Sequence, residues 1–567
     1  MQISTFRPGV IALAACALLA ACGGGGNSVV ASTPTSPTTP TTPTTPITPT
    51  SPTTTTPTTP TTPTPVAAKA CDPSTFAATA LVDAKVLSAT MVEANAYKPA
   101  GSNSAIANLP AFCLVKAQAT PTSDSLINFE VWVPRDNWNQ KLVATGNGGY
   151  SPALSYGDMA YAMRQGYATL GGDTGHQSAD GNDMFFGVGH PEKIRDWGTR
   201  SINAITVPGK QIVAQLQGTA AKRAYYYGAS TGGHQAYAEI QRYPQDFDGV
   251  IAGAPGNNRT ALNAEFLWRY LSNRVPNTNT LVLTSAKAAL ITRSAIAACD
   301  AIDGVADGVL ADPRACTSAQ FNLDSLLCPG ADAATCLTAD QIAAARKIYA
   351  GPKNPRTAAQ IYPGPVVGSE SGWSSYWGGT APTRSDFWAL WVYDNPQWNW
   401  WTFDFDRDMS FSLAKVGPLV DQNSTDLSAF KARGGKLITF QGWIDPVVNA
   451  NDTIAYYEKV RTAQGSQQNI DGFFRLFLAP GMGHVSGGTG PVVFGNGGLQ
   501  APNPSAANDL LMALDKWVET DSAPATVVAS QVQAGAVVAT RPLCAYPKAA
   551  VYKGSGATTD AGNFSCQ

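Results

Sequence analysis

Short apolar runs that alternate with glycine-rich turns mark the middle of the chain. The aromatic run 225–227 stops at Gly228, and a second apolar run covers Gly249–Gly253. Between them, residues 234–242 carry apolar side chains at helical spacing. Because a strand, a helix and another strand follow one another here, the pattern predicts parallel strands in an α/β fold.

The same pattern returns near the carboxyl terminus. Apolar runs at 436–441 and 473–479 predict two more strands, and each one ends in a turn that contains glycine. Asp445 follows the first of these strands, and His484 follows the second. The two side chains therefore stand just beyond the ends of neighbouring predicted strands.

The turn after the run 225–227 has the pattern G-x-S-x-G, formed by Gly228, Ser230 and Gly232. This pattern is typical of a nucleophile elbow, a tight strand-to-helix turn that pushes the serine hydroxyl out of the sheet. Glycines suit such a turn because a side chain there would collide with the neighbouring strand and helix. An ordinary glycine-rich turn can carry the same letters, so the interpretation depends on partners for the serine.

The partners follow by elimination among four histidines, at positions 176, 190, 234 and 484. In an α/β-hydrolase, an acid and then a histidine follow the nucleophilic serine along the chain. His234 lies only four residues after Ser230, so we expect it to be structural or to line the pocket. His484 would then take the serine proton, and Asp445 would orient the imidazole and stabilise its charged form.

The composition of the chain limits the classes of function that it can have. The chain has 567 residues, of which 44% are hydrophobic and 14% charged, with a net charge of −2. Such a chain can bury one large or two medium cores, and it carries no excess of positive charge for nucleic acid.

The amino terminus predicts export. A single arginine and a short apolar stretch make residues 1–21 a lipoprotein signal peptide that ends before Cys22, the expected lipidation site. Cys16 is a competing lipidation site, but the apolar region before it is shorter. Residues 22–70, glycines followed by a Thr/Pro-rich tract, predict a disordered tether, or a spacer of no functional consequence. We therefore expect an outer-membrane or cell-surface lipoprotein whose catalytic domain is periplasmic or extracellular.

Eight cysteines remain once Cys16 and Cys22 are set aside. An even number in an exported chain predicts disulfides, although eight cysteines allow 105 pairings. Pairing of neighbours is the simplest choice: Cys71 with Cys113, Cys299 with Cys316, Cys328 with Cys336, and Cys544 with Cys566.

The candidate catalytic residues fall in two stretches, 71–257 and 433–567, which predict one α/β domain interrupted by an insertion. Residues 258–432 hold four of these eight cysteines and eight of the 13 tryptophans. An insertion at this point would cover the site as a lid. Its aromatic side chains would wall a pocket for a flat ligand, or, more simply, form the insertion's own core.

Three carboxylates crowd one loop of this insertion, at Asp300, Asp303 and Asp307, with glycines at 304 and 308. Oxygen ligands on a tight loop suit Ca²⁺. The loop is not an EF-hand because no glutamate stands at the required position after the glycine. Asp/Gly clusters also form plain turns.

At this point the motifs resemble a known family. The elbow 228–233, the run 146–150 (Gly-Asn-Gly-Gly-Tyr), the turn 442–446, and Gly483 with His484 are similar to those of the tannase/feruloyl esterase family, which includes the mono(2-hydroxyethyl) terephthalate hydrolase. The resemblance covers residues 71–567, the Asp/Gly loop included. It implies an α/β-hydrolase core with an inserted lid domain, and it agrees with the neighbour pairing of cysteines.

The resemblance also implies roles for particular groups. The oxyanion hole would use the backbone N–H groups of Thr231 and Gly148, with Gly149 as the next choice. Structural Ca²⁺ would be held by the carboxylates named above together with the carbonyls of Val305 and Val309.

One departure stands out. The family commonly carries a disulfide between cysteines directly before the serine and directly after the histidine, but this chain has Ala229 and Val485 there. The catalytic chemistry needs no disulfide, so we expect the triad to persist with less rigid loops.

These observations predict a monomeric carboxylic ester hydrolase that acts on small aromatic-acid esters of the feruloyl, galloyl or terephthalate mono-ester type through an acyl-enzyme. One alternative is an esterase for non-aromatic short-chain esters. Another is a non-catalytic surface module that binds polysaccharide. Lipid at Cys22 and a small ester are the expected partners, and nucleic acid is not.

Overall fold

A mixed sheet of nine strands, in the order β1-β2-β3-β5-β4-β6-β7-β8-β9, organises this computed structural model, which describes residues 68–567 except 151 and 179. β1, β2, β3 and β5 pair antiparallel, whereas the strands from β5 to β9 pair parallel. The strands are β1 (Ala84–Val92), β2 (Phe112–Ala119), β3 (Ile127–Pro134), β4 (Lys141–Thr145), β5 (Ala168–Gly172), β6 (Arg223–Ala229), β7 (Gly249–Gly253), β8 (Lys436–Gly442) and β9 (Phe474–Ala479). The expected α/β fold is confirmed.

Helices cover both faces of the sheet because successive strand residues point to opposite sides. On β6, Tyr226 joins a core with α3, α4 and α11, while Tyr225 and Tyr227 join a second core with α1 and α13. Parallel strands buried on both faces explain the continuous apolar runs in the sequence. These helices are α1 (Tyr156–Arg164), α3 (Ser201–Gln217), α4 (Thr231–Arg242), α11 (Ala450–Gln464) and α13 (Leu510–Thr520).

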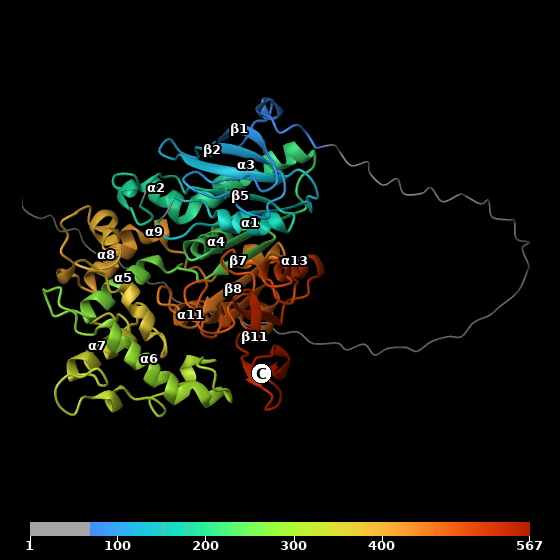
Figure 1. Cartoon of the computed structure of the whole chain (residues 1–567). Helices are drawn as coiled ribbons and strands as arrows, with labels where there is room; N and C mark the ends of the chain where they lie inside the picture. The colour runs from blue at the N-terminus through green and yellow to red at the C-terminus, as the bar shows by residue number, and fades with distance from the viewer. Residues whose placement is uncertain (1–67, 151, 179) are drawn as a thin grey trace, which may run out of the picture. The chain divides into compact units, whose positions relative to one another are not determined.

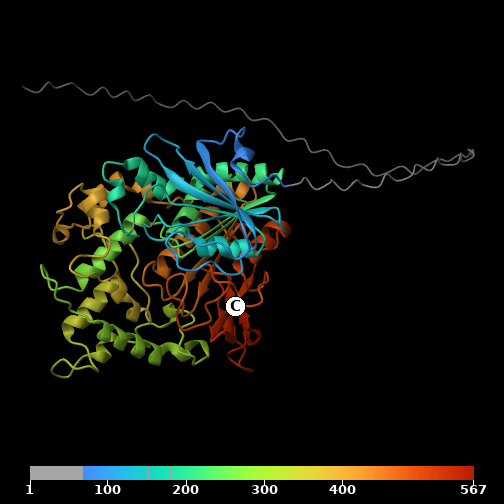
Figure 2. The same cartoon turned by 45° about the horizontal axis from the view of Figure 1, so that its top comes forward.

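The segment between β7 and β8 forms the predicted insertion. Figures 1 and 2 show its helices α5 to α8 grouped beside the strand-bearing part of the molecule. Its helices are α5 (Arg259–Ser272), α6 (Ser285–Cys299), α7 (Ala339–Ala350), α8 (Arg407–Lys415), α9 (Gly417–Val420) and α10 (Ser428–Ala432). Residues 65–567 make up a single compact unit, so the insertion packs on the sheet domain rather than standing apart.

Four of the eight tryptophans of the insertion are buried in cores. Trp373 and Trp377 belong to a cluster with α6 and α7, and Trp388 and Trp391 belong to another. The second cluster also contains Trp197 and other residues from the sheet domain, so it packs the insertion against that domain. The remaining four, at 268, 398, 400 and 401, are half-buried.

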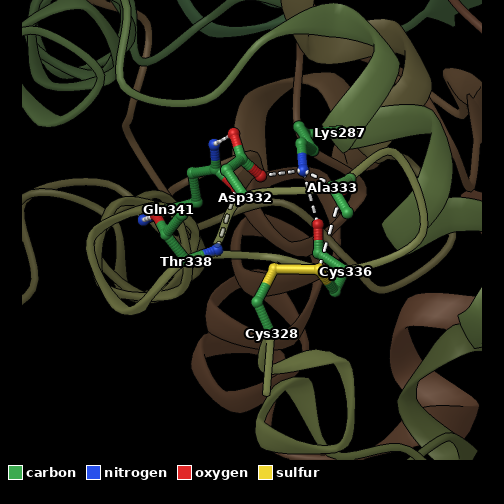
Figure 3. Close-up of a disulfide and its surroundings, with 7 residues drawn as sticks. All are labelled: Lys287, Cys328, Asp332, Ala333, Cys336, Thr338 and Gln341. Atoms are coloured by element: carbon green, nitrogen blue, oxygen red, sulfur yellow. Dashed lines mark hydrogen bonds and ion pairs between the residues drawn. A yellow bond between two sulfur atoms is a disulfide. The ribbon is translucent and has the colours of Figure 1, made fainter. Parts of the chain in front are cut away.

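All four expected disulfides are present, with the neighbour pairing. Figure 3 shows the surroundings of Cys328–Cys336 in the insertion, where Lys287 of α6 reaches this short loop. The Lys287 ammonium donates to the carbonyls of Ala333 and Cys336, at 2.6 Å each, and pairs with the Asp332 carboxylate. The disulfide and the lysine together hold the loop against α6.

The carboxyl-terminal part adds two small hairpins, and two short helices complete the fold. These elements are β10 (Thr526–Gln533) with β11 (Ala536–Cys544), β12 (Ala550–Tyr552) with β13 (Phe564–Cys566), α2 (Pro191–Arg195) and α12 (Gln467–Asp471). The predicted signal peptide, lipidation site and nearly all of the tether lie outside the described residues. Within residues 68–567, no helix has the length and apolar character needed to cross a bilayer.

Glycines let three backbone segments meet at the elbow. A Cβ added to Gly146, after β4, would stand 2.2 Å from the Tyr226 hydroxyl oxygen and 2.5 Å from the Cα of Gly232. A Cβ on Gly233 would stand 2.3 Å from the carbonyl oxygen of Gly253, the last residue of β7, and 2.9 Å from the Cα of Pro255 just beyond it. The loops after β4, β6 and β7 therefore touch backbone to backbone.

We expect Gly146→Ala to lower the free energy of unfolding by at least about 2 kcal/mol, because the new methyl group has no room among fully buried neighbours. Gly157→Ala in α1 is the control, since a Cβ there meets nothing within 4 Å. Chemical denaturation of the two variants measures the difference. Equal stability of both would contradict the close approach.

Candidate active site

Four loops converge at the carboxyl edge of the parallel strands. Ser230 follows β6, Asp445 follows β8, His484 follows β9, and the run 146–149 follows β4. Residues distant in sequence meet there because parallel strands all end at the same edge of the sheet.

The three predicted triad residues lie in hydrogen-bond contact. Nδ1 of His484 is 2.8 Å from Oδ2 of Asp445, and Nε2 of His484 is 2.8 Å from Oγ of Ser230. With the Nδ1–H donating to the carboxylate, Nε2 is free to accept the serine proton. The geometry fits general-base activation of a serine nucleophile.

The serine stands in a strained turn. Ser230 has φ 62° and ψ −117°, outside the regions that L-residues favour, and its N–H donates to the carbonyl of Gly253 at 2.8 Å. α4 begins directly afterwards, at Thr231, three residues earlier than the apolar spacing indicated. Strain of this kind persists only where the surroundings hold it, as the touching backbones do here.

The acid is buried and fully hydrogen-bonded. Oδ1 of Asp445 accepts the N–H groups of Val447 and Val448 at 2.7 and 3.1 Å, and Oδ2 accepts the side-chain amide of Gln441 at 3.0 Å. A buried carboxylate needs such donors to stay charged. Sequence reasoning missed Gln441, because a glutamine at the end of a strand carries no signal of its own.

The loop that carries His484 lies against the end of β8. A Cβ on Gly442 would stand only 2.3 Å from the carbonyl oxygen of Gly483, so the two backbones touch. Beyond His484, Val485 has φ 65°, and its carbonyl accepts the Asn496 amide at 2.7 Å. Ala229 and Val485, the positions without cysteine, pack against the same apolar core. Packing and hydrogen bonds hold the histidine loop.

The loop after β4 is held at both ends and open in the middle. The Asn147 N–H donates to Gln235 at 3.0 Å, and the Tyr150 N–H donates to the Gly181 carbonyl at 3.2 Å. Between them, the N–H groups of Gly148 and Gly149 have no acceptor among the described residues. Either N–H can join that of Thr231 in binding an oxyanion.

His234 has a structural role. It is fully buried on α4, and its Nε2–H donates to the carbonyl of Val420 in the insertion at 2.7 Å. Burial lowers the pKa of His234 well below its ordinary value, so the ring is neutral. The expectation that His234 is structural agrees with this contact.

The insertion also supports the acid. Arg269 of α5, which is fully buried, pairs with Glu265 at 2.5 Å, donates to the carbonyl of Pro446, and donates to Asn449 Oδ1 at 2.9 Å. Pro446 and Asn449 belong to the turn that carries Asp445. One helix of the insertion therefore contacts the turn that positions Asp445.

The Asp/Gly loop keeps its carboxylates engaged with backbone groups. Asp300 accepts the N–H groups of Gly308 and Val309 at 3.0 Å each, and Asp307 pairs with Arg541 at 2.6 Å. Burial raises the pKa of Asp303, and the charges of Asp307 and Asp300 add to this effect. Across residues 68–567, apart from the two not described, no group of three or more His, Cys, Asp or Glu side chains is gathered as a metal site.

Two backbone groups of this loop are unsatisfied. The carbonyls of Val305 and Val309, which belong to residues only 3% and 4% exposed, accept no hydrogen bond from the described residues. Buried carbonyls normally have a partner. The carboxylate and carbonyl oxygens of the loop are therefore ligands that fit a hard cation.

The fold and the three contacting residues define the class of protein, an α/β-hydrolase of the serine esterase type. The family model described as tannase and feruloyl esterase matches residues 113–567. The chain belongs to this family and is a carboxylic ester hydrolase.

Individual relatives support the same family assignment. An uncharacterized esterase of Xanthomonas campestris pv. campestris is 37% identical over 526 residues, which cover 86% of this chain and 90% of the relative. A protein of Aspergillus terreus named "probable feruloyl esterase B-2" is 34% identical over 489 residues, 83% of this chain and 91% of its own. The crystal structure of feruloyl esterase B from Aspergillus oryzae superposes with a TM-score of 0.81 at 30% identity, over 88% of this chain and 99% of that one.

We expect Arg269→Met to lower the free energy of unfolding by about 3–5 kcal/mol, because it leaves the buried Glu265 carboxylate without its partner. Esterase activity should fall as well, since the Asp445 turn loses two donors. Arg346→Met is the matched control, because Arg346 pairs with Asp324 where both side chains are 54% exposed, and an exposed pair contributes about 0–1 kcal/mol. Thermal unfolding that is unchanged in Arg269→Met would exclude this bracing.

Proposed function

We propose that the protein hydrolyses small aromatic-acid esters through an acyl-enzyme on Ser230. His484 removes the serine proton during attack and returns it to the leaving alcohol, while Asp445 holds the imidazole tautomer. The N–H groups of Thr231 and Gly148, or Gly149 in its place, bind the oxyanion. The observation that carries the proposal is the position of His484, 2.8 Å from both the serine and the acid.

The relatives named as feruloyl esterases support an aromatic substrate. Feruloyl, galloyl and terephthalate mono-esters share a flat aromatic acid part. Tyr150 and Trp197 stack beside the proposed oxyanion loop with ring centroids 4.5 Å apart, but both are fully buried. They therefore hold that loop, to which the Trp197 indole N–H donates at the Gly149 carbonyl at 3.3 Å, and do not line a substrate pocket.

The second candidate is an esterase for non-aromatic short-chain esters. It is favoured by the burial of Trp373, Trp377, Trp388 and Trp391, which fill cores instead of lining an open pocket. Comparing kcat/KM for methyl ferulate, methyl gallate and mono(2-hydroxyethyl) terephthalate with that for an alkyl butyrate separates the two. A higher kcat/KM for the butyrate than for all three aromatic esters would overturn the aromatic preference.

The protein is further proposed to be exported and anchored by lipid at Cys22, with residues 22–70 as the tether of a monomeric domain. Four disulfides support an oxidising compartment.

Ser230→Ala and His484→Ala should each reduce kcat by about 10⁴-fold or more with the fold intact, and Asp445→Ala somewhat less. His190→Ala is the control, because this exposed histidine pairs with Asp124 far from the triad in sequence and should leave kcat unchanged. Steady-state kinetics on a chromogenic ester, with circular dichroism, measures both. Substantial turnover by Ser230→Ala would refute the assignment of the nucleophile.

Calcium is proposed to bind the loop 300–309 through Asp300, Asp303, Asp307 and the carbonyls of Val305 and Val309. The unsatisfied carbonyls and the mutual repulsion of the carboxylates support it, and a bound cation would neutralise that repulsion.

Chelation should therefore lower the melting temperature, and Asp303→Asn with Asp307→Asn should abolish the effect of the chelator. Asp340→Asn, an exposed carboxylate in the first turn of α7, is the control and should keep that effect. Elemental analysis of the purified protein gives the metal content. Protein without calcium whose melting curve ignores the chelator would rule the site out.

A further inference from the structure

Arg259 is a buried cation without an ion-pair partner among the described residues. It opens α5, immediately after the loop that follows β7, and it is only 4% exposed. In the part of the chain that the structure describes, it forms no ion pair, and its Nε has no hydrogen-bond acceptor. A charge in this condition is costly to bury, and proteins normally pair such groups.

Its surroundings increase that cost. Burial lowers the pKa of Arg259, and the neighbouring Arg384 adds to this, while Tyr150 and Asp421 oppose it. Asp421 makes no ion pair with Arg259 among the described residues, and its Oδ1 accepts the Thr260 N–H at 2.8 Å. The ring faces of Trp197 and Tyr150, 5.1 and 5.8 Å from the guanidinium carbon, supply the remaining attraction.

Among the residues that the structure describes, the guanidinium has one hydrogen-bond partner, and that partner is in the site. Nη2 of Arg259 donates to Oγ1 of Thr231 at 3.3 Å, and the Thr231 hydroxyl donates in turn to the carbonyl of Gly149 at 2.8 Å. Trp197 donates to the same carbonyl. The chain Arg259–Thr231–Gly149 therefore connects the two sides of the proposed oxyanion hole, the first turn of α4 and the loop after β4.

The missing negative charge appears only during the reaction. Attack of the serine hydroxyl on an ester carbonyl forms the C–O bond, moves the carbonyl electron pair onto oxygen and passes the serine proton to His484. The resulting oxyanion lies against the N–H of Thr231, one residue from the nucleophile. A fixed positive charge that is unpaired in the resting enzyme interacts more strongly with that state than with the neutral ester.

We propose that Arg259 is a positioning residue of the esterase reaction, which orients the oxyanion loop through the Thr231 hydroxyl and stabilises the oxyanion by its uncompensated charge. The inference rests on the proposed function, because it requires Ser230 as nucleophile and Thr231 as an oxyanion donor.

The test uses Arg259→Met, which keeps the length of the side chain and removes its charge. We expect kcat on a chromogenic ester to fall about 10²-fold with KM within about threefold, as for the loss of one oxyanion contact. Affinity for an arylboronic acid, which adds to the serine as a tetrahedral anion, should fall in parallel. Affinity for the product acid should not change.

Further variants separate the effect of the Arg259 charge from the effect of its hydrogen bond to Thr231. Arg259→Lys should recover part of kcat because it retains the charge without the planar fork. Thr231→Val should reduce kcat as well, and the double variant should lose less than the product of the two single losses, because both act through one chain of hydrogen bonds. Arg384→Met is the matched control, since this guanidinium lies 4.9 Å from the Tyr150 ring without contacting Thr231, and kcat should stay within about threefold.

An unchanged kcat in Arg259→Met would overturn the proposal, and so would a loss confined to KM and product-acid affinity, which would mark direct substrate binding. If the Met variant does not fold, a full kcat in Thr231→Val overturns it and a reduced kcat with weakened boronate affinity supports it. Full turnover by Ser230→Ala would instead refute the proposed function itself.

Discussion

Backbone contact between neighbouring loops is the constraint on which the site depends. At Gly146, Gly228 and Gly233 a single added carbon would overlap atoms of a neighbouring segment. This contact holds Ser230 in its strained turn and places the loop after β4 beside it. A larger spacing would leave the serine free to relax and would move the Gly148 and Gly149 N–H groups away from the nucleophile.

The insertion contributes to the site through contacts with the segments that position Asp445 and Ser230. Arg269 reaches the turn that carries Asp445, and Val420 accepts a hydrogen bond from His234 on the helix that follows the serine. Trp388 and Trp391 share a core with Trp197. The insertion therefore contacts both the turn of Asp445 and the helix that follows Ser230, even though Ser230, Asp445 and His484 all come from the sheet domain.

Electrostatics at the site is asymmetric. Asp445 is surrounded by hydrogen-bond donors, whereas Arg259 is buried beside aromatic faces with no carboxylate of the described residues within ion-pair distance. The site thus has a fully hydrogen-bonded carboxyl group behind the histidine and an unpaired cation behind the proposed oxyanion loop. This arrangement matches a reaction in which the imidazole becomes positive and the substrate oxygen becomes negative.

Local sequence predicted four parallel strands of the nine-stranded sheet, the elbow and the contacting residues Ser230, Asp445 and His484, because apolar runs, glycine spacing and the order of serine, acid and histidine can be read along the chain. The disulfide pairing followed from the spacing of the cysteines only as the simplest choice among many. Tertiary structure alone decided the roles of Gln441, Arg269 and Arg259, since each acts on a segment far away in sequence or on a partner met only in the folded protein. It also decided which tryptophans of the insertion are core, because burial depends on packing between segments, and the sequence pattern of one segment does not contain its neighbours.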